Sequence, residues 1–195
     1  MKNFRIIFAE DDPVCATFLR RSLQHLGHDV IGETDTGEEV ITLCRDRRPD
    51  LLLTDIQLRG LNGQQAAEAI LDQQILPVIL ISSHHSETMV ERARSNDISA
   101  YLVKPIELAD LSTTIPIVMQ RFQDMQTTKN ENARLSQELQ NRKLIERAKG
   151  ILMKRSCLDE SVAFNRIRKM ARDRRVCLAE IANCIIVSEE ALGGV

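Results

Sequence analysis

Five short apolar runs alternate with longer segments of helical periodicity in the first 120 residues, and this alternation restricts the fold more than any other feature. The runs are FRIIFA at 4–9, DVIGE at 29–33, DLLLTD at 50–55, PVILIS at 77–82 and SAYLVK at 99–104. Runs such as LLL and VILI are apolar at consecutive positions, which is typical of parallel strands covered by helices on both faces. The pattern predicts a five-stranded, doubly wound parallel α/β sheet, whose ligands bind at the carboxyl ends of the strands.

Polar residues stand where four of these predicted strands end. They are Glu10 and Asp11 after the first strand, Asp55 after the third, Ser82 after the fourth and Lys104 after the fifth. Three carboxylates brought together repel by about 4 kcal/mol per close pair at an effective dielectric near 20, so the site requires a positive partner. Mg²⁺ fits because it prefers oxygen ligands and commonly pairs carboxylates with a phosphate. We therefore predict a Mg²⁺ site in which Asp55 attacks phosphorus, and in which Lys104 and Ser82 bind the transferred phosphoryl group.

Four segments resemble the receiver domain of two-component response regulators, over residues 4 to about 120: EDD at 10–12, LLLTDIQLRGLNG at 51–63, PVILISS at 77–83 and AYLVKP at 100–105. The resemblance implies a flavodoxin-like fold and a sensor histidine kinase as phosphoryl donor. It implies that Glu10 and Asp11 are the acidic metal pair, Asp55 the phospho-acceptor, Gln57 a carbonyl ligand of the metal, Ser82 the switch hydroxyl, Tyr101 the aromatic that changes rotamer, and Lys104 the phosphate-pairing lysine. Family members usually carry proline four residues after the acceptor. Arg59 and Gly60 replace that turn here, which leaves the conformation of the loop open.

Simpler interpretations exist for each residue alone. A strand-end aspartate, or the EDDP segment, can cap a helix that begins near Pro13, and a Lys-Pro pair is common in loops. Phosphatases of the haloacid-dehalogenase type also use an aspartate nucleophile with Mg²⁺, but after the first strand and with a second acid two residues on. Asp55 follows the third strand and position 57 is glutamine, so we expect a switch rather than an enzyme. The adjacent His84 and His85 lack metal-ligand spacing and receive no role.

The two halves of the chain carry opposite charge. Residues 1–120 hold 11 Lys and Arg against 18 Asp and Glu, a net of −7, whereas residues 121–195 hold 15 against 10, a net of +5. A basic half behind an acidic one is typical of a protein with a polyanionic partner. No apolar run has the length of a membrane span and no secretory signal is present, so we expect a cytoplasmic protein without a membrane partner. Five cysteines without CxxC spacing indicate neither a disulfide framework nor a zinc site.

The segment after the predicted sheet has the pattern of a long helix. Apolar residues recur at Leu111, Ile115, Val118, Phe122 and Met125, and return at Leu135 and Leu139. Steps of four and three residues predict a coiled-coil seam. An apolar stripe of this kind left in water would promote aggregation, so we expect a homodimer through this helix. A solvated helical linker is the alternative. The expected organisation is a receiver at 1–120, a helical coiled-coil linker at 121–141 and a third region at 142–195.

Residues 142–187 are predicted to form a small three-helix all-α domain. The second helix has an apolar face of Val162, Ala163, Ile167 and Met170. The segments IERAKGILMKR, DESVAFNRIRKMA and LAEIA are similar to the ANTAR domain, an RNA-binding module found behind receivers in bacterial antitermination regulators. The resemblance implies binding of paired RNA hairpins by a dimer, which prevents a terminator from forming.

The charge of this region supports a phosphate-binding face. Residues 142–175 hold 12 Lys and Arg against 4 Asp and Glu, a net of +8. The candidate RNA contacts, expected outside the apolar faces, are Arg147, Lys149, Lys154, Arg155, Arg168, Lys169 and Arg172. We expect Phe164 in the core, which leaves base recognition to arginine stacking and hydrogen bonds.

Three alternatives remain for the second half: a merely solvated basic face, a DNA-binding output, and a protein-interaction output through the coiled coil. CLAEIANCII is too apolar for a DNA recognition helix. The prediction is therefore a phosphorylation-dependent response regulator that binds RNA hairpins and promotes transcription antitermination.

Overall fold

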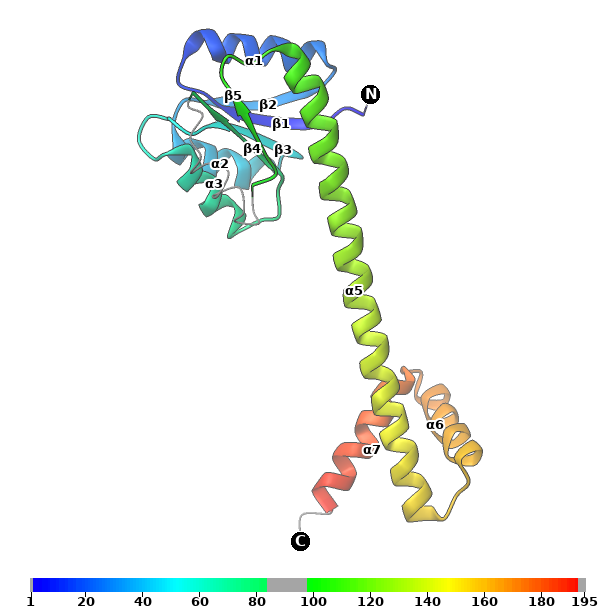
Figure 1. The fold of residues 1–195 in the computed structure, drawn as a ribbon. Coiled ribbons are helices and arrows are strands. Elements are labelled where there is room, and N and C mark those ends of the chain that lie inside the picture. Colours follow the sequence, from blue (N-terminus) through cyan, green and yellow to red (C-terminus); the bar gives the residue numbers. More distant parts are fainter. Residues whose placement is uncertain (1, 84–97, 193–195) are drawn as a thin grey trace. The chain divides into compact units, whose positions relative to one another are not determined.

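A computed structural model describes residues 2–83 and 98–192, so His84 and His85 lie outside the described residues (Figure 1). The chain divides into two compact units, Met1–Met125 and Gln126–Val195, which we call the N-terminal and the C-terminal unit. Both units share one unbroken helix, α5, which spans Leu108–Ser156. All five cysteines are free thiols. None of the helices in the described part of the chain is both long and apolar enough to span a membrane.

The N-terminal unit is a five-stranded parallel sheet with strand order β2-β1-β3-β4-β5. Its described elements are β1 (Arg5–Ala9), α1 (Pro13–His25), β2 (Asp29–Thr34), α2 (Gly37–Arg47), β3 (Leu51–Asp55), α3 (Gly63–Leu71), β4 (Val78–Ser82), β5 (Ala100–Val103) and the start of α5. The predicted fold class is confirmed, and the predicted strands differ from the observed ones by at most one residue at either end. Strand order reverses between β1 and β3, so the carboxyl ends of these two strands border the ligand-binding crevice of this fold class.

The strands are apolar at consecutive positions because both faces of the sheet are covered (Figure 1). Side chains alternate between the two faces of a strand. Ile6 and Phe8 of β1 pack with α1 and α5, whereas Ile7 and Ala9 pack with α2 and α3. All four side chains are fully buried.

The beginning of α5 belongs to the core of the N-terminal unit. Leu111, Ile115, Val118 and Met119 are buried and pack with α1 and one face of the sheet. The prediction that Leu111, Ile115 and Val118 form a subunit seam is therefore wrong, because the sheet of the same chain already covers them. Periodicity shows that a helix has an apolar face, but it cannot show which surface covers that face.

The remainder of the predicted seam is more exposed. Phe122 is half-buried, while Met125, Leu135 and Leu139 are exposed. Dimerisation through the helical linker stays a prediction, and it now rests on Leu135 and Leu139.

The C-terminal unit is built from the end of α5, α6 (Glu160–Arg174) and α7 (Leu178–Leu192). Three helices are confirmed, although the first is the end of α5 and not a separate short helix. The buried core comprises Ala148, Ile167, Ala171, Ile181, Ala182 and Ile186. Two predictions for α6 are wrong: Val162 is 47% exposed and Phe164 is 36% exposed. The inward face of α6 is defined by Ala163, Ile167 and Ala171, and the two neighbours of Ala163 in sequence point to either side of that face.

We predict that Ile115→Ala lowers the free energy of unfolding of the N-terminal unit by about 2–5 kcal/mol, because it leaves a cavity in a packed core. Ile117→Ala is the matched control, since Ile117 is 52% exposed on the same helix and its loss should change stability by no more than about 0.5 kcal/mol. The fluorescence of Tyr101, the chain's one tyrosine, reports this unit during urea titration. If the two variants change the free energy of unfolding equally, Ile115 is not packed in this core, and an intersubunit seam is again the better interpretation.

Candidate functional site

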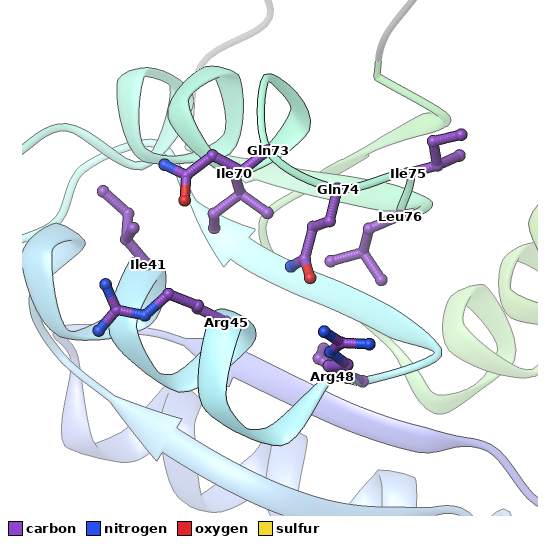
Figure 2. A pocket seen from close by; sticks show the side chains of 9 residues that line it. Ile41, Arg45, Arg48, Ile70, Gln73, Gln74, Ile75 and Leu76 are labelled. Carbon is purple, nitrogen blue, oxygen red and sulfur yellow. The ribbon is translucent and has the colours of Figure 1, made fainter.

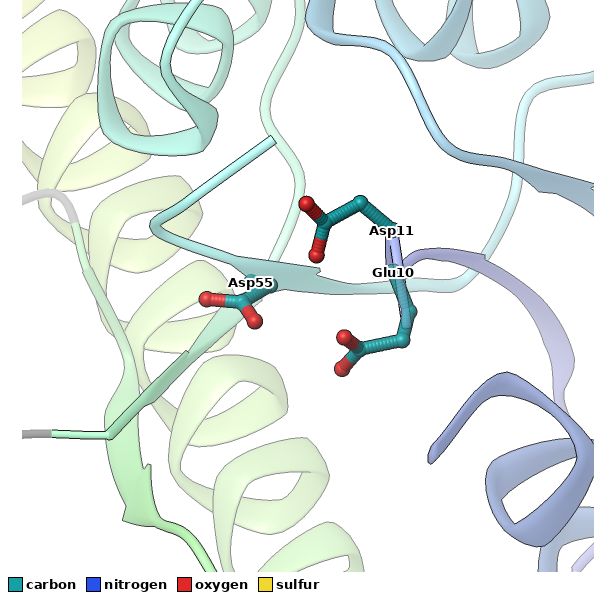
Figure 3. Close-up of side chains that lie close together, drawn as sticks. All are labelled: Glu10, Asp11 and Asp55. Atoms are coloured by element: carbon teal, nitrogen blue, oxygen red, sulfur yellow. The ribbon is translucent and has the colours of Figure 1, made fainter. Parts of the chain in front are cut away.

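Three carboxylates converge at the edge of the sheet where β1 and β3 end (Figure 3). Glu10 and Asp11 directly follow β1, and Asp55 is the last residue of β3. One carboxylate oxygen from each residue lies within 4.8 Å of the others. Glu10 and Asp55 are only 3% and 4% exposed, while Asp11 is exposed to solvent. The structure therefore brings together the three acids that the sequence places at this edge, and their role as metal ligands stays a prediction.

Lys104, at the end of β5, provides the positive charge at this cluster. Its Nζ lies 2.7 Å from Glu10 Oε1 and also forms a short ion pair with Asp55 Oδ2. Burial lowers the pKa of the Lys104 ammonium, but hydrogen bonds to Asp55 and Glu10 outweigh burial and raise that pKa well above its usual value. Lys104 therefore lies between the two buried carboxylates and pairs with both.

Glu10 also fits a divalent cation. Its second carboxylate oxygen, Oε2, is buried and has no hydrogen-bond partner among the described residues. Burial raises the pKa of the Glu10 carboxyl and the charge of Asp55 adds to this, against the hydrogen bonds from Lys104 and the Asp12 backbone. An unpartnered carboxylate oxygen in a cluster of three acids is the ligand type that Mg²⁺ prefers, so these residues suit that ion.

Two neighbouring residues have distinct positions. The Gln57 backbone N–H donates to Asp55 Oδ1 at 2.9 Å, so residue 57 lies next to the acceptor, and its role as a carbonyl ligand stays a prediction. Asp12 is the N-cap of α1, since its carboxylate accepts from Val14 N–H at 3.1 Å and Cys15 N–H at 3.4 Å. Capping, the simpler interpretation of the EDDP segment, is correct for Asp12 and not for Glu10 or Asp11.

The loop after Asp55 is held by the β2–α2 loop. Arg59 N–H donates to Asp35 O at 3.2 Å, and Arg59 O accepts from Gly37 N–H at 3.3 Å. The Arg59 guanidinium also pairs with the Asp35 carboxylate. These contacts hold the loop in place without a proline. The loop conformation, which the sequence left open, is therefore determined by backbone hydrogen bonds with the β2–α2 loop.

Gly60 and Gly63 are essential to this loop, and sequence reasoning did not assign them a role. Gly60 has φ +72°, and an added Cβ would lie 2.6 Å from a Glu38 oxygen. Glu38 itself accepts a hydrogen bond from Leu61 N–H at 3.0 Å. A Cβ on Gly63 would overlap the carbonyl oxygen of Asp55. The two glycines of the LRGLNG segment are the sequence feature that could have indicated this role, because glycine is required where backbones approach closely.

The remaining predicted site residues lie at the ends of β4 and β5. Ser82 is the buried last residue of β4, and its carbonyl accepts from Lys104 N–H at 2.8 Å. Tyr101 is half-buried on β5, opposite Leu80 of β4, and packs on the side of the sheet covered by α2 and α3. The switching roles of Ser82 and Tyr101 stay predictions.

Two surface cavities help to locate the site. A cavity of about 420 Å³ between α2 and α3 is lined by residues such as Arg45, Arg48 and Ile70 (Figure 2). Its lining includes Pro49 and Leu76, which precede β3 and β4, so it lies at the opposite edge of the sheet from Asp55. Another cavity, of about 410 Å³, opens beside Glu10 and Asp11. The second cavity therefore borders the two acids that follow β1.

The seven predicted RNA contacts fall into two groups. Three are engaged in ion pairs within the C-terminal unit: Lys149 with Glu146 at 2.8 Å and Glu160 at 2.6 Å, Arg147 with Glu190 at 2.8 Å, and Arg155 with Glu189 at 2.7 Å. Lys154, Arg168, Lys169 and Arg172 are exposed and form no ion pair with any described residue.

Lys149 contradicts the expectation that all seven cations lie outside the packed faces. Its side chain is only 9% exposed, and the hydrogen bonds that its ammonium donates to Glu146 and Glu160 raise its pKa. Lys149 thus links α5 to α6, and sequence reasoning missed this because the pairing depends on helices meeting in space. We no longer count Lys149 among the candidate RNA contacts.

The sheet order, the acidic cluster after β1 and β3 and the lysine after β5 together define the receiver class of α/β proteins. Comparison with known proteins agrees, since residues 6–116 match the response regulator receiver domain and residues 133–186 match the ANTAR domain. The chain belongs to the response regulators that carry a receiver domain followed by an ANTAR domain.

Individual relatives cover different parts of the chain. The transcriptional regulatory protein PdtaR of Mycobacterium tuberculosis is 34% identical over 97% of this chain and 91% of its own length. The transcriptional regulatory protein AfsQ1 of Streptomyces coelicolor is 31% identical over 60% of this chain and 51% of its own length. Among solved structures, the signal receiver domain of a modulated diguanylate cyclase from Desulfovibrio desulfuricans aligns with a TM-score of 0.58 and 32% identity, over 63% of this chain and 98% of that one.

We predict that Gly63→Ala slows phosphorylation of Asp55 by up to about 100-fold, because the new Cβ displaces the Asp55 backbone and small misplacements of a reacting group are costly. Gly150→Ala is the matched control, since a Cβ there would meet nothing within 4 Å. The measurement is a mass-spectrometric time course with an acyl-phosphate donor. Identical rates for both variants would show that the loop absorbs the added methyl group freely.

Proposed function

We propose that the chain is a phosphorylation-dependent response regulator whose ANTAR unit binds RNA hairpins and promotes transcription antitermination. The observation that carries the receiver half is the cluster of buried Glu10 and Asp55 with half-buried Lys104, beside the exposed Asp11. The proposal includes a sensor histidine kinase as donor, Mg²⁺ as cofactor, a homodimer through residues 121–141, and the cytoplasm as location, where transcripts are made.

The chain's own residues support in-line phosphoryl transfer. An Asp55 carboxylate oxygen attacks the phosphorus of a phosphohistidine, an O–P bond forms, the P–N bond breaks, and its electron pair leaves with the imidazole nitrogen. Mg²⁺, held by Glu10, Asp11 and Asp55, would supply charge neutralisation for the carboxylates and the incoming phosphoryl oxygens. Lys104 already donates a hydrogen bond to Asp55 and can pair with a phosphoryl oxygen once the carboxylate has become an acyl phosphate.

The RNA-binding half rests on the ANTAR match and on the charge of the C-terminal unit. Helix α6 alone carries five Lys and Arg against two Asp and Glu. All five of those cations are exposed and form no ion pair with a described residue, and they include the candidate contacts Arg168, Lys169 and Arg172. Unpaired cations on one helix provide phosphate contacts without breaking intramolecular ion pairs.

The receiver chemistry predicts that the protein gains one phosphoryl group from a small acyl phosphate or a phosphohistidine donor only when Mg²⁺ is present. Asp55→Asn should abolish the mass increase, and a chelator should do the same to the wild type, because Glu10 and Asp11 otherwise repel the incoming anion. Intact-mass spectrometry measures both effects. Labelling of Asp55→Asn at the wild-type level, or labelling insensitive to chelation, contradicts this part of the proposal.

The output is tested with an RNA hairpin that carries an unpaired loop and a DNA hairpin of the same sequence, titrated across a salt series. We expect a preference for RNA that survives at high salt, because loop bases and the 2′-hydroxyl are read in RNA. Arg168→Gln and Arg172→Gln should each flatten the slope of log affinity against log salt by about 0.7 per lost single-strand phosphate contact. Equal binding of RNA and DNA at every salt concentration would favour a DNA-binding or nonspecific output. Absence of binding to both would favour a protein-interaction output.

A further inference from the structure

Phe164 lies at the surface of the ANTAR unit. The ring is 36% exposed and does not belong to the described hydrophobic core of that unit. Leaving part of an aromatic ring in water forfeits some of the stabilisation that full burial would give. Folding of this unit alone therefore leaves part of the apolar surface of Phe164 exposed to water.

Two unpaired arginines share the helix face of Phe164. Arg168 and Arg172 follow it at intervals of four residues, and residues four apart on a helix are neighbours about 5–6 Å apart at Cβ. Both are exposed, and neither forms an ion pair with a described residue. The face therefore presents one aromatic ring and two free guanidinium groups in a row.

An aromatic ring beside cations that are not neutralised is the arrangement used to bind single-stranded nucleic acid. The ring stacks on the face of a base, while the cations follow the phosphate backbone. A protein partner could also cover Phe164, but the five cations of α6 and the net charge of +8 over residues 142–175 favour a polyanion.

We propose that Phe164, Arg168 and Arg172 form a stacking seat for one unpaired base in the loop of the bound RNA hairpin. The inference rests on the proposed RNA-binding function and adds the means of base recognition. Phe164 contacts the base face, and Arg168 and Arg172 pair with phosphates next to that base. Because every base has a π face, the seat selects unpaired over paired nucleotides more strongly than it selects one base over another.

The experiment uses the full chain, treated with acyl phosphate and Mg²⁺, and two RNA probes with the same stem. One probe has a randomised loop, and the other has a loop of ethylene-glycol linker without bases. Phe164→Leu keeps an apolar side chain but removes the π face, and Phe164→Tyr restores it. Val162→Ala is the matched control, because Val162 is an exposed apolar residue of the same helix.

Phe164→Leu should weaken binding of the base-containing loop by about 5- to 150-fold, the range that corresponds to about 1–3 kcal/mol per stacked base. Binding of the base-free loop should not change, and the salt dependence should stay as in the wild type, since no charge is lost. Phe164→Tyr and Val162→Ala should bind both probes like the wild type.

The failures are distinguishable. A wild type that does not distinguish RNA from DNA overturns the proposed RNA-binding function together with this inference. A wild type that prefers RNA but binds the two loops equally overturns the stacking seat alone. A wild type that prefers the base-containing loop, with Phe164→Leu unchanged, overturns the stacking seat alone. A Phe164→Leu variant whose mass by light scattering falls while its RNA affinity holds assigns the ring to a contact between copies, which also overturns the seat.

Discussion

Two buried carboxylates can exist at the edge of this sheet because Lys104 lies between them. Burial of an unpaired charge is costly, and a paired one is tolerated only with good hydrogen bonding. Glu10 comes from the end of β1, Asp55 from β3 and Lys104 from the residue after β5, so this one cation joins three strands. The same arrangement leaves Glu10 Oε2 without a hydrogen-bond partner among the described residues.

Helix α5 contributes to two separate cores. Its first turns bury Leu111, Ile115 and Val118 against the receiver sheet, and its last turns bury Ala148 in the ANTAR unit. The residues from 127 to 140 are exposed in an unbroken run. Most helical stability in proteins comes from the packing of an apolar face, so this exposed middle depends on the packed ends for its stability. The middle of α5 is therefore the part of the helix least constrained by tertiary contacts.

The sequence predicted the sheet and its acidic edge because both depend on local pattern. A strand covered on both faces is apolar at every position, and the residue after such a strand lies at the carboxyl edge, as Asp55 does. Predictions failed where the partner of a side chain lies elsewhere in space. Val118 follows a coiled-coil pattern but packs on the sheet, and Lys149 is buried because Glu160 lies on another helix. Phe164 was predicted to lie in the core, but it is exposed because its neighbour Ala163 occupies the inward position of α6.

The contact between Gly60 and Glu38 links two positions that are distant in sequence. Any side chain at 60 must tolerate a positive φ and must also displace the Glu38 carboxylate, which holds Leu61 N–H. A replacement at 60 therefore strains the backbone and moves the flexible end of the Glu38 side chain, which weakens its hydrogen bond with Leu61 N–H. The loop beside Asp55 is thus coupled to Glu38 in the first turn of α2, so a substitution at either position changes how Leu61 N–H is held.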